Sequence, residues 1–470
     1  MRASRRQFLK TCSLMSIAGA ASPFALNLAA ISAASAATPP GYKAIVCLFF
    51  YGGNDHTNTF IPYDPTSTDG VSYDRYLASR DTIAIPYAQL AATSTGAVAS
   101  QGGHSFAFHP ALTAFKSHWD AGKLAVVANV GPLIDPILTK ADYQNPSVRK
   151  PPKLFSHNDQ QSVWQAHQPI GEGAKIGWGG KIGDLLMSQN TNPNNNKLFT
   201  CISAGGSSVF LSGQSVIQYQ VGSNGPTPIS SISGTIYGSQ GTAASTAYRS
   251  LITGTSPNLF ENELGVVTDR SIDANLQLSG ALSGAPVLNP AVPANNSLAS
   301  QLAIVARIIS VADALQTNRQ VFLVSIGGFD NHDVLLTQHA QQLTLVNNAV
   351  SAFYSWLVQL GVQDQVTLFT ASDFGRTLTS NGDGSDHGWG SHHFVLGGSV
   401  VGQQVYGTFH PTIYGAGNPA DIGQGNLIPG FSVDQYAATF AHWLGVSDTN
   451  LPLVLPNVGN FSPNYLSFLP

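Results

Sequence analysis

The fold is decided by residues 43–55, KAIVCLFFYGGND. The apolar run at residues 43–51 is typical of a strand that is buried on both faces of a sheet. Gly52 and Gly53 let the backbone turn sharply where this strand ends, and the turn leads to the carboxylate of Asp55. The segment therefore predicts a central buried strand that ends in an acid.

The same pattern recurs along the chain. Apolar runs predict further strands at residues 124–130, 321–326 and 366–370. Apolar residues at helical spacing predict helices at residues 110–121, 298–315, 336–359 and 433–443. Strands that alternate with helices of this length indicate an α/β protein with a mostly parallel sheet and helices on both faces, a three-layer α/β/α sandwich.

Residues 187–296 differ in character from the rest. They are rich in Ser, Gly, Asn and Thr and contain short alternating runs such as residues 208–211. We predict an inserted, partly β subdomain here, between a first part of the α/β core at 37–186 and a second part at 297–470. The alternative is a flexible insertion of low complexity without a function.

The first residues predict export. Residues 4–10 (SRRQFLK) match the twin-arginine pattern, an apolar stretch follows, and Ala34-Ser35-Ala36 offers a cleavage site. We expect residues 1–36 to be a signal peptide that engages the twin-arginine translocase, and the mature protein to be periplasmic or secreted. Pro23 and Asn27 argue against a transmembrane anchor. No second segment is long and apolar enough to span a bilayer, so we expect no stable membrane insertion after cleavage.

The charge balance argues against nucleic acid as a partner. Residues 1–36 hold four of the 21 basic residues and none of the 25 acidic ones, so the mature chain has a formal charge of −8. Binding to a phosphate backbone needs clustered Lys and Arg. The weakly charged surface, with 10% charged residues, fits an extracytoplasmic protein.

Three strand runs end in an acid, and histidines accompany them. The acids are Asp55, Asp330 and Asp373, and the carboxyl ends of parallel strands are where ligands bind in such sheets. His332 lies two residues after Asp330, and residues 386–393 (DHGWGSHH) contain further imidazoles, among them His387 and His392.

Carboxylates and imidazoles from separate strand ends suit a divalent cation, with zinc first and manganese, iron or calcium as alternatives. Each residue also has an ordinary structural explanation. An Asp after a strand often caps the next helix, and a His in a glycine-rich loop is often a turn or packing residue. The whole set of acids and histidines carries the metal hypothesis.

Three further residues are candidates for catalysis. Ser156 lies where a helix is expected to begin, so it is a candidate nucleophile and equally a common N-cap. His157 could be a metal ligand, a proton donor or a residue that orients the loop. Arg376 could bind an anionic substrate oxygen or pair with an acid.

Six motifs carry a resemblance to a known family. They are GGND at 52–55, HPAL at 109–112, SH at 156–157, GGFDNH at 327–332, SDFGR at 372–376 and DHG at 386–388. Their order resembles that of a twin-arginine-exported family of proteins of unknown function, number 1501. The similarity covers nearly the whole mature chain. That family is similar to the alkaline-phosphatase-like superfamily, which includes phosphatases and sulfatases.

The resemblance implies an alkaline-phosphatase-like fold with one or two metals and a nucleophile at Ser156. It places Asp55 and Asp373 on the metal nearest the nucleophile. It assigns three residues to the other metal: Asp330, His332 and His387. Phe374 stands where the superfamily has a histidine, so the first of these sites departs from the pattern.

We therefore expect an exported, metal-dependent hydrolase of phosphate or sulfate esters, or a related transferase, that acts on an anionic ester substrate. The alternative is a non-catalytic exported binding or assembly protein on the same fold, with residues 187–296 as its recognition surface.

Overall fold

The strand β1 (Lys43–Phe50) lies in the middle of the molecule and is buried on both faces. Its alternate residues Ala44, Val46 and Leu48 join one hydrophobic core, while Ile45 and Cys47 join the other. The computed structural model describes residues 41–166, 173–190, 198–233 and 242–470. The predicted signal peptide lies outside these residues and stays a prediction.

The main sheet is mixed and mostly parallel. Among the described residues it has nine strands, and β1 pairs in parallel with β8 and β9. The strand β12 runs antiparallel to both of its neighbours. The path is β13 (Val405–Tyr406), β5 (Leu124–Gly131), β12 (Ser391–Gly397), β9 (Val366–Ser372), β1, β8 (Arg319–Ile326), β6 (Cys201–Ser203) and β7 (Tyr219–Gln220), and β14 (Phe431–Ser432) pairs with β5.

The register brings three strand ends level with one another. Phe50 of β1 pairs with Ile326 of β8 on one side and with Ser372 of β9 on the other. The segments that follow these strands therefore emerge together at one edge of the sheet. The parallel arrangement predicted from the apolar runs is confirmed, and it places Asp330 and Asp373 beside the end of β1.

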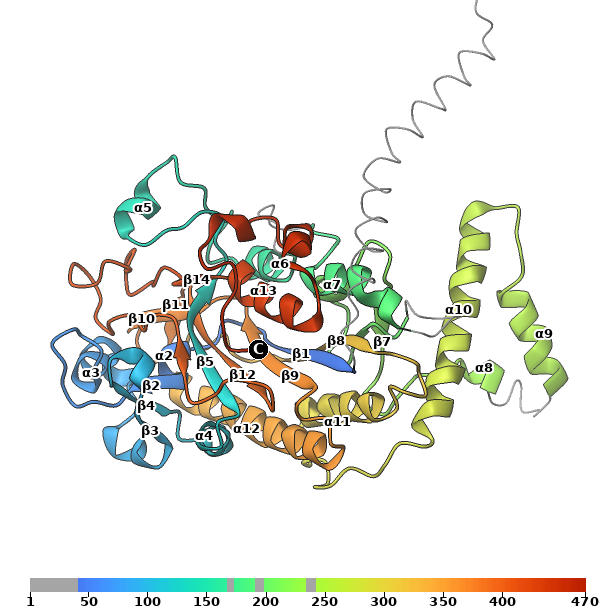
Figure 1. Ribbon diagram of the computed structural model, residues 1–470, viewed down its shortest axis with the longest axis horizontal. Coiled ribbons are helices and arrows are strands. Elements are labelled where there is room, and N and C mark those ends of the chain that lie inside the picture. The colour runs from blue at the N-terminus through green and yellow to red at the C-terminus, as the bar shows by residue number, and fades with distance from the viewer. Residues whose placement is uncertain (1–40, 167–172, 191–197, 234–241) are drawn as a thin grey trace, which may run out of the picture.

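Helices cover both faces of the sheet (Figure 1). One face packs against α4 (Thr113–Asp120), α10 (Leu259–Leu282), α11 (Ser297–Ser310) and α12 (Leu335–Gln359). The other packs against α6 (His157–Ala166), α7 (Trp178–Leu186), α13 (Val433–Leu444) and α14 (Leu451–Val454). The α/β class with a large, mostly parallel sheet is therefore confirmed. None of the helices in the described ranges is both long enough and apolar enough to cross a bilayer.

Residues 187–296 combine short strands with helices. Their strands β6 and β7 extend the main sheet next to β8, because the apolar residues of β6 pair in register with Val321–Leu323. The later part is helical, with α8 (Ser230–Ser233), α9 (Thr242–Ile252) and α10. The helices α9 and α10 project from the body beside β7 (Figure 1). The boundaries of the insertion stay a prediction.

Smaller elements surround the carboxyl ends of the central strands. They are α2 (His56–Thr59), α3 (Tyr73–Arg80), α5 (Lys140–Gln144), the sheet of β2 (Phe60–Pro62), β4 (Ser105–Phe108) and β3 (Ser94–Ala97), and the hairpin of β10 (Arg376–Ser380) and β11 (Ser385–His387). The β10–β11 hairpin matters most for function, because it carries Arg376 at its start and His387 at its end.

Candidate metal centre

Tight backbone packing brings Asp330 to the end of β1. Gly52 has φ +114°, and a Cβ there would collide with the backbone nitrogen of Asp330. Only glycine permits both the backbone angle and this close approach. The Gly-Gly pair seen in the sequence therefore serves to bring the segment after β8 against the segment after β1.

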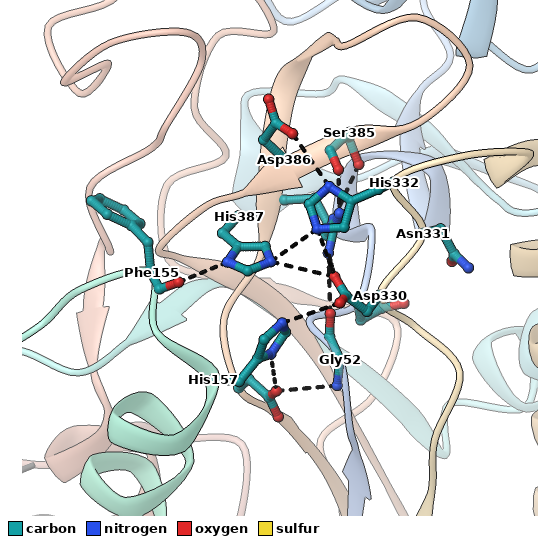
Figure 2. Close-up of polar contacts among 12 residues, drawn as sticks. Gly52, Phe155, His157, Asp330, Asn331, His332, Ser385, Asp386 and His387 are labelled. Atoms are coloured by element: carbon teal, nitrogen blue, oxygen red, sulfur yellow. Dashed lines mark hydrogen bonds and ion pairs between the residues drawn. The ribbon is translucent and has the colours of Figure 1, made fainter. Parts of the chain in front are cut away.

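Three imidazoles converge on the carboxylate of Asp330 (Figure 2). The Nε2 atoms of His332 and His387 lie 3.0 Å and 3.3 Å from its Oδ1 atom. The Nε2 atom of His157 lies 3.3 Å from its Oδ2 atom. The two nitrogens of His332 and His387 are themselves 3.0 Å apart. His157, Asp330 and His387 each place a ligand atom within 4.8 Å of the other two.

The opposite nitrogen of each ring is held by an oxygen outside the group. The Nδ1 atom of His157 lies 2.7 Å from Asp373 Oδ2, and that of His387 lies 2.7 Å from the carbonyl oxygen of Phe155. His332 turns its Nδ1 atom to Asp386 Oδ1 at 3.3 Å. The oxygens that face His157 and His387 accept, so the Nδ1 atom of each of these two rings carries a proton.

This donor set fits a cation. The Nε2 atoms of His332 and His387 and the Oδ1 atom of Asp330 lie within 3.0–3.3 Å of one another. Tetrahedral coordination with bonds of roughly 2.0–2.1 Å separates ligand atoms by about 3.3–3.4 Å. The buried Nε2 atom of His157 has no hydrogen-bond partner. Metal-bound histidines commonly donate their other nitrogen to a carboxylate or a backbone carbonyl, as these rings do.

The ionisation of the cluster reflects its surroundings. The hydrogen bond to Asp373 raises the pKa of His157. Burial lowers the pKa of His387, which favours the neutral ring that a ligand must have. Burial alone would raise the pKa of Asp330, but the hydrogen bond and charge of Arg376 outweigh it and lower that pKa. Asp330 therefore stays ionised at neutral pH.

Arg376 joins the parts of the site. Its Nη1 atom donates to Asp330 Oδ1 at 2.6 Å and to the carbonyl oxygen of Gly52 at 3.2 Å. Its Nε and Nη2 atoms donate to the hydroxyl and the carbonyl oxygen of Ser385. The side chain is buried. Of the two roles expected for Arg376, the structure supports the pairing with an acid, because its donors are engaged within the protein.

Asp55 has a partner other than the cluster. Its carboxylate forms a buried ion pair with Arg80, which also donates to the carbonyl oxygens of Thr377 and Leu378. The structure does not bring Asp55 to the three imidazoles, and its role as a metal ligand stays a prediction. Asp373 follows β9 as expected, but its contact with the cluster runs through the ring of His157.

His392 and Ser156 have hydrogen-bond partners other than the three imidazoles. His392 belongs to β12 and is buried, where its Nδ1 atom accepts from the backbone nitrogen of Asn129. The structure does not bring it to the cluster, and its role as a ligand stays a prediction. Ser156 directly precedes α6, as predicted, and its hydroxyl donates to Asp159 Oδ2 at 2.7 Å.

Several contributors to the site were not among the predicted site residues. Two of them, the carbonyl oxygen of Phe155 and the backbone nitrogen of Gly52, are main-chain atoms, which the type of residue does not reveal. Gln161, which donates to Asp373 at 2.9 Å, lies one helical turn after His157, so helical spacing could have identified it. Asp386 stands directly before His387 in the sequence and was visible there.

The fold and the site define an α/β protein with a candidate metal centre at the carboxyl ends of its parallel strands. Residues 289–452 match the family described as protein of unknown function (DUF1501), which confirms the family resemblance for this part of the chain. The matched part contains five residues of the site: Asp330, His332, Asp373, Arg376 and His387. No curated protein matches the chain in sequence.

Some solved structures are distantly similar. Ps i-CgsB in complex with k-i-k-neocarrahexaose has a TM-score of 0.34 at 11% identity and covers 88% of this chain and 74% of that one. Alkaline phosphatase from the Antarctic bacterium TAB5 gives 0.29 at 9%, with 77% and 93% covered. The lipoteichoic acid synthase LtaP from Listeria monocytogenes gives 0.28 at 8%, with 77% and 66% covered. These likenesses are too distant to assign an activity.

Proposed function

We propose that the chain is an exported, metal-dependent hydrolase of phosphate or sulfate esters. The observation that carries the proposal is the convergence of three Nε2 atoms on Asp330, with every Nδ1 atom turned to an outside oxygen. Asp330 is 44% exposed, so a ligand from solvent can reach the cluster. The motif resemblance to the alkaline-phosphatase-like superfamily points to an anionic ester as the substrate.

Each residue of the site has its own proposed role. His157, His332, His387 and Asp330 would hold the cation, and zinc suits this mixture of nitrogen and oxygen ligands best. A divalent cation here would polarise an ester oxygen and favour ionisation of a nucleophile. Arg376 keeps the carboxylate of Asp330 ionised and fixed in place.

Ser156 is the proposed nucleophile, and water is the alternative. Its hydroxyl already donates to Asp159, whose buried carboxylate can accept the proton as the oxygen attacks phosphorus or sulfur. As the ester bond breaks, Asp159 returns this proton to the leaving oxygen, which departs as the alcohol. Water then hydrolyses the covalent ester and restores the Ser156 hydroxyl. Asp159 also pairs with Lys153 at 3.4 Å, which favours the ionised carboxylate.

The test combines metal analysis with turnover. Protein exported by its own cell should contain stoichiometric metal and hydrolyse nitrophenyl phosphate or nitrophenyl sulfate. Asp330→Ala should lose both metal and turnover, and Ser156→Ala should keep the metal and lose turnover. His442→Ala is a matched control, because His442 is a surface histidine paired with Asp448, away from the cluster. Metal-free protein with no turnover of either ester would contradict the proposal.

Export is part of the proposal and has its own test. We infer a periplasmic or secreted location from the twin-arginine pattern at residues 4–10. Replacing Arg5 and Arg6 with Lys should leave the full-length chain in the cytoplasm. Export of this variant at the normal rate would contradict the assignment.

A second candidate function rests on the helices that project from the body. Leu259 and Phe260, at the start of α10, are 77% and 84% exposed, and Leu251 at the end of α9 is 79% exposed. Exposed apolar side chains in such numbers are typical of an interaction surface. A non-catalytic binding protein would keep its partner when Asp330 is replaced by Ala and lose it when Phe260 is replaced by Ser.

A further inference from the structure

Asp373 is the most completely buried acid of the site. Its side chain is 0% exposed, and its Oδ2 atom accepts three hydrogen bonds. The donors are the backbone nitrogen of Gly52 at 3.1 Å, Gln161 Nε2 at 2.9 Å and His157 Nδ1 at 2.7 Å. The Oδ1 atom is buried and makes no hydrogen bond, so Oδ2 carries all the hydrogen bonds that hold this carboxylate.

These contacts fix the orientation of the His157 ring. Gly52 and Gln161 belong to two different segments, and both donate to Oδ2 of Asp373. The Nδ1 atom of His157 donates to the same oxygen. In the neutral ring, a proton on Nδ1 leaves the lone pair on Nε2. That Nε2 atom is the one that faces Asp330 at 3.3 Å. The carboxylate thus sets both the proton position and the direction of the ring.

We propose that Asp373 is a positioning residue that holds His157 ready to bind a cation, and that it is not itself a ligand. This inference rests on the proposed metal site. It departs from the motif resemblance, which places Asp373 directly on a metal. The structure separates the two roles, because Asp373 reaches the converging group only through the His157 ring, and His157, Asp330 and His387 supply the ligand atoms that lie within 4.8 Å of one another.

The test measures zinc affinity, with zinc alone, by competition against a chromophoric chelator. Asp373→Asn has nearly the same shape, but its amide can donate to Nδ1 and so drive the proton to Nε2. We expect zinc binding to weaken by about 10–100-fold, the range found when partners of metal-bound histidines are replaced. Asp448→Asn is the matched control, because Asp448 faces the Nδ1 atom of His442 in a similar pair outside the site. It should change the affinity less than threefold.

A second measurement needs neither metal nor a variant. Nitrogen NMR of the His157 ring in the metal-free wild type should show the proton on Nδ1, and in Asp373→Asn the signal should show it moved or shared. A role confined to stability would lower the melting temperature without moving the proton.

The outcomes separate this inference from the proposed function. Zinc affinity in Asp373→Asn within threefold of wild type would overturn the positioning role. Loss of zinc as complete as in Asp330→Asn would show that Asp373 is a ligand, and would also overturn it. A wild-type protein that binds no zinc would contradict the proposed function. The position of the proton on His157 would still show whether Asp373 orients that ring.

Discussion

The Nε2 atoms of His332 and His387 lie 3.0 Å apart, while the Nδ1 atom of each ring faces an oxygen outside the pair. Without a cation, only a proton on one of these nitrogens can hold the two rings this close beside a carboxylate. The first prediction follows from this: metal removal should destabilise the fold. A chelator should lower the melting temperature, and zinc at 100 times its dissociation constant should restore about 2.7 kcal/mol.

The matched pair His387→Ala and His442→Ala checks this prediction by differential scanning calorimetry. In His387→Ala the zinc-dependent rise in melting temperature should disappear, because a ligand is missing. In His442→Ala it should equal that of the wild type. A wild type whose melting temperature does not respond to zinc would contradict the cation site.

The sequence predicted the central part of the fold well because burial on both faces leaves a strong signal. The run at 43–51 became β1, and the run at 366–370 became β9, with ends within two residues. The histidine-rich segment at 386–393 was expected to be a loop, but its last three residues begin the fully buried strand β12. Its opening Ser391, His392 and His393 carry no apolar pattern, and only tertiary pairing with β5 makes them a strand.

The site was predictable where ligands follow strands and unpredictable where partners come from elsewhere. Asp330, His332 and His387 meet because parallel strands end at one edge. The partner of Asp55 could not be foreseen, because Arg80 lies 25 residues away at the end of a helix that carries no site motif. For residues 187–296 the composition indicated a partly β insertion, but it could not show that β6 joins the main sheet by pairing with β8.

The second prediction concerns the buried pair of Asp55 and Arg80. Arg80→Met removes the only ion-pair partner the structure gives Asp55 and leaves a carboxylate in the interior. The free energy of unfolding should fall by about 3–5 kcal/mol, as measured by urea denaturation. The double variant with Asp55→Asn should lose less than the sum of the single variants, because the unpaired charge is gone.

The same variants test whether Asp55 takes part in metal binding. Asp55→Asn alone should leave zinc affinity within threefold of wild type, since the carboxylate pairs with Arg80 rather than with the cluster. A tenfold or larger loss of zinc affinity, in protein that remains folded, would show that Asp55 is a ligand.

The third prediction is a pH dependence far from the metal centre. Burial lowers the pKa of His118 from its ordinary value near 6.5 to about 4, and its ring packs on Tyr354 with centroids 4.8 Å apart. Between these two values the unfolded chain binds a proton that the folded chain does not. Stability is therefore complete above pH 6.5 and is lost as the pH falls toward 4, with a slope of at most about 1.4 kcal/mol per pH unit.

His118→Phe keeps the ring packing and removes the titration. The difference in unfolding free energy between wild type and variant should change with pH only between about 6.5 and 4, in favour of the variant as the pH falls. Urea unfolding at a series of pH values measures this difference. A difference that stays constant with pH would show that the ring is not buried as described.

The last prediction concerns Gly52, which lets the end of β1 approach Asp330. Both Gly52 and Gly206 have a positive φ, +114° for Gly52 and +91° for Gly206. A Cβ on Gly206 would meet nothing within 4 Å, whereas a Cβ on Gly52 would collide with the Asp330 backbone. Gly206→Ala should cost only the strain of the left-handed region, about 1–2 kcal/mol. Gly52→Ala should add about 1–3 kcal/mol from overpacking, measured by urea unfolding. It should also weaken zinc binding at least tenfold, because the displaced segment carries Asp330 and His332. Equal effects of the two substitutions on zinc affinity would mean that this close approach does not position the ligands.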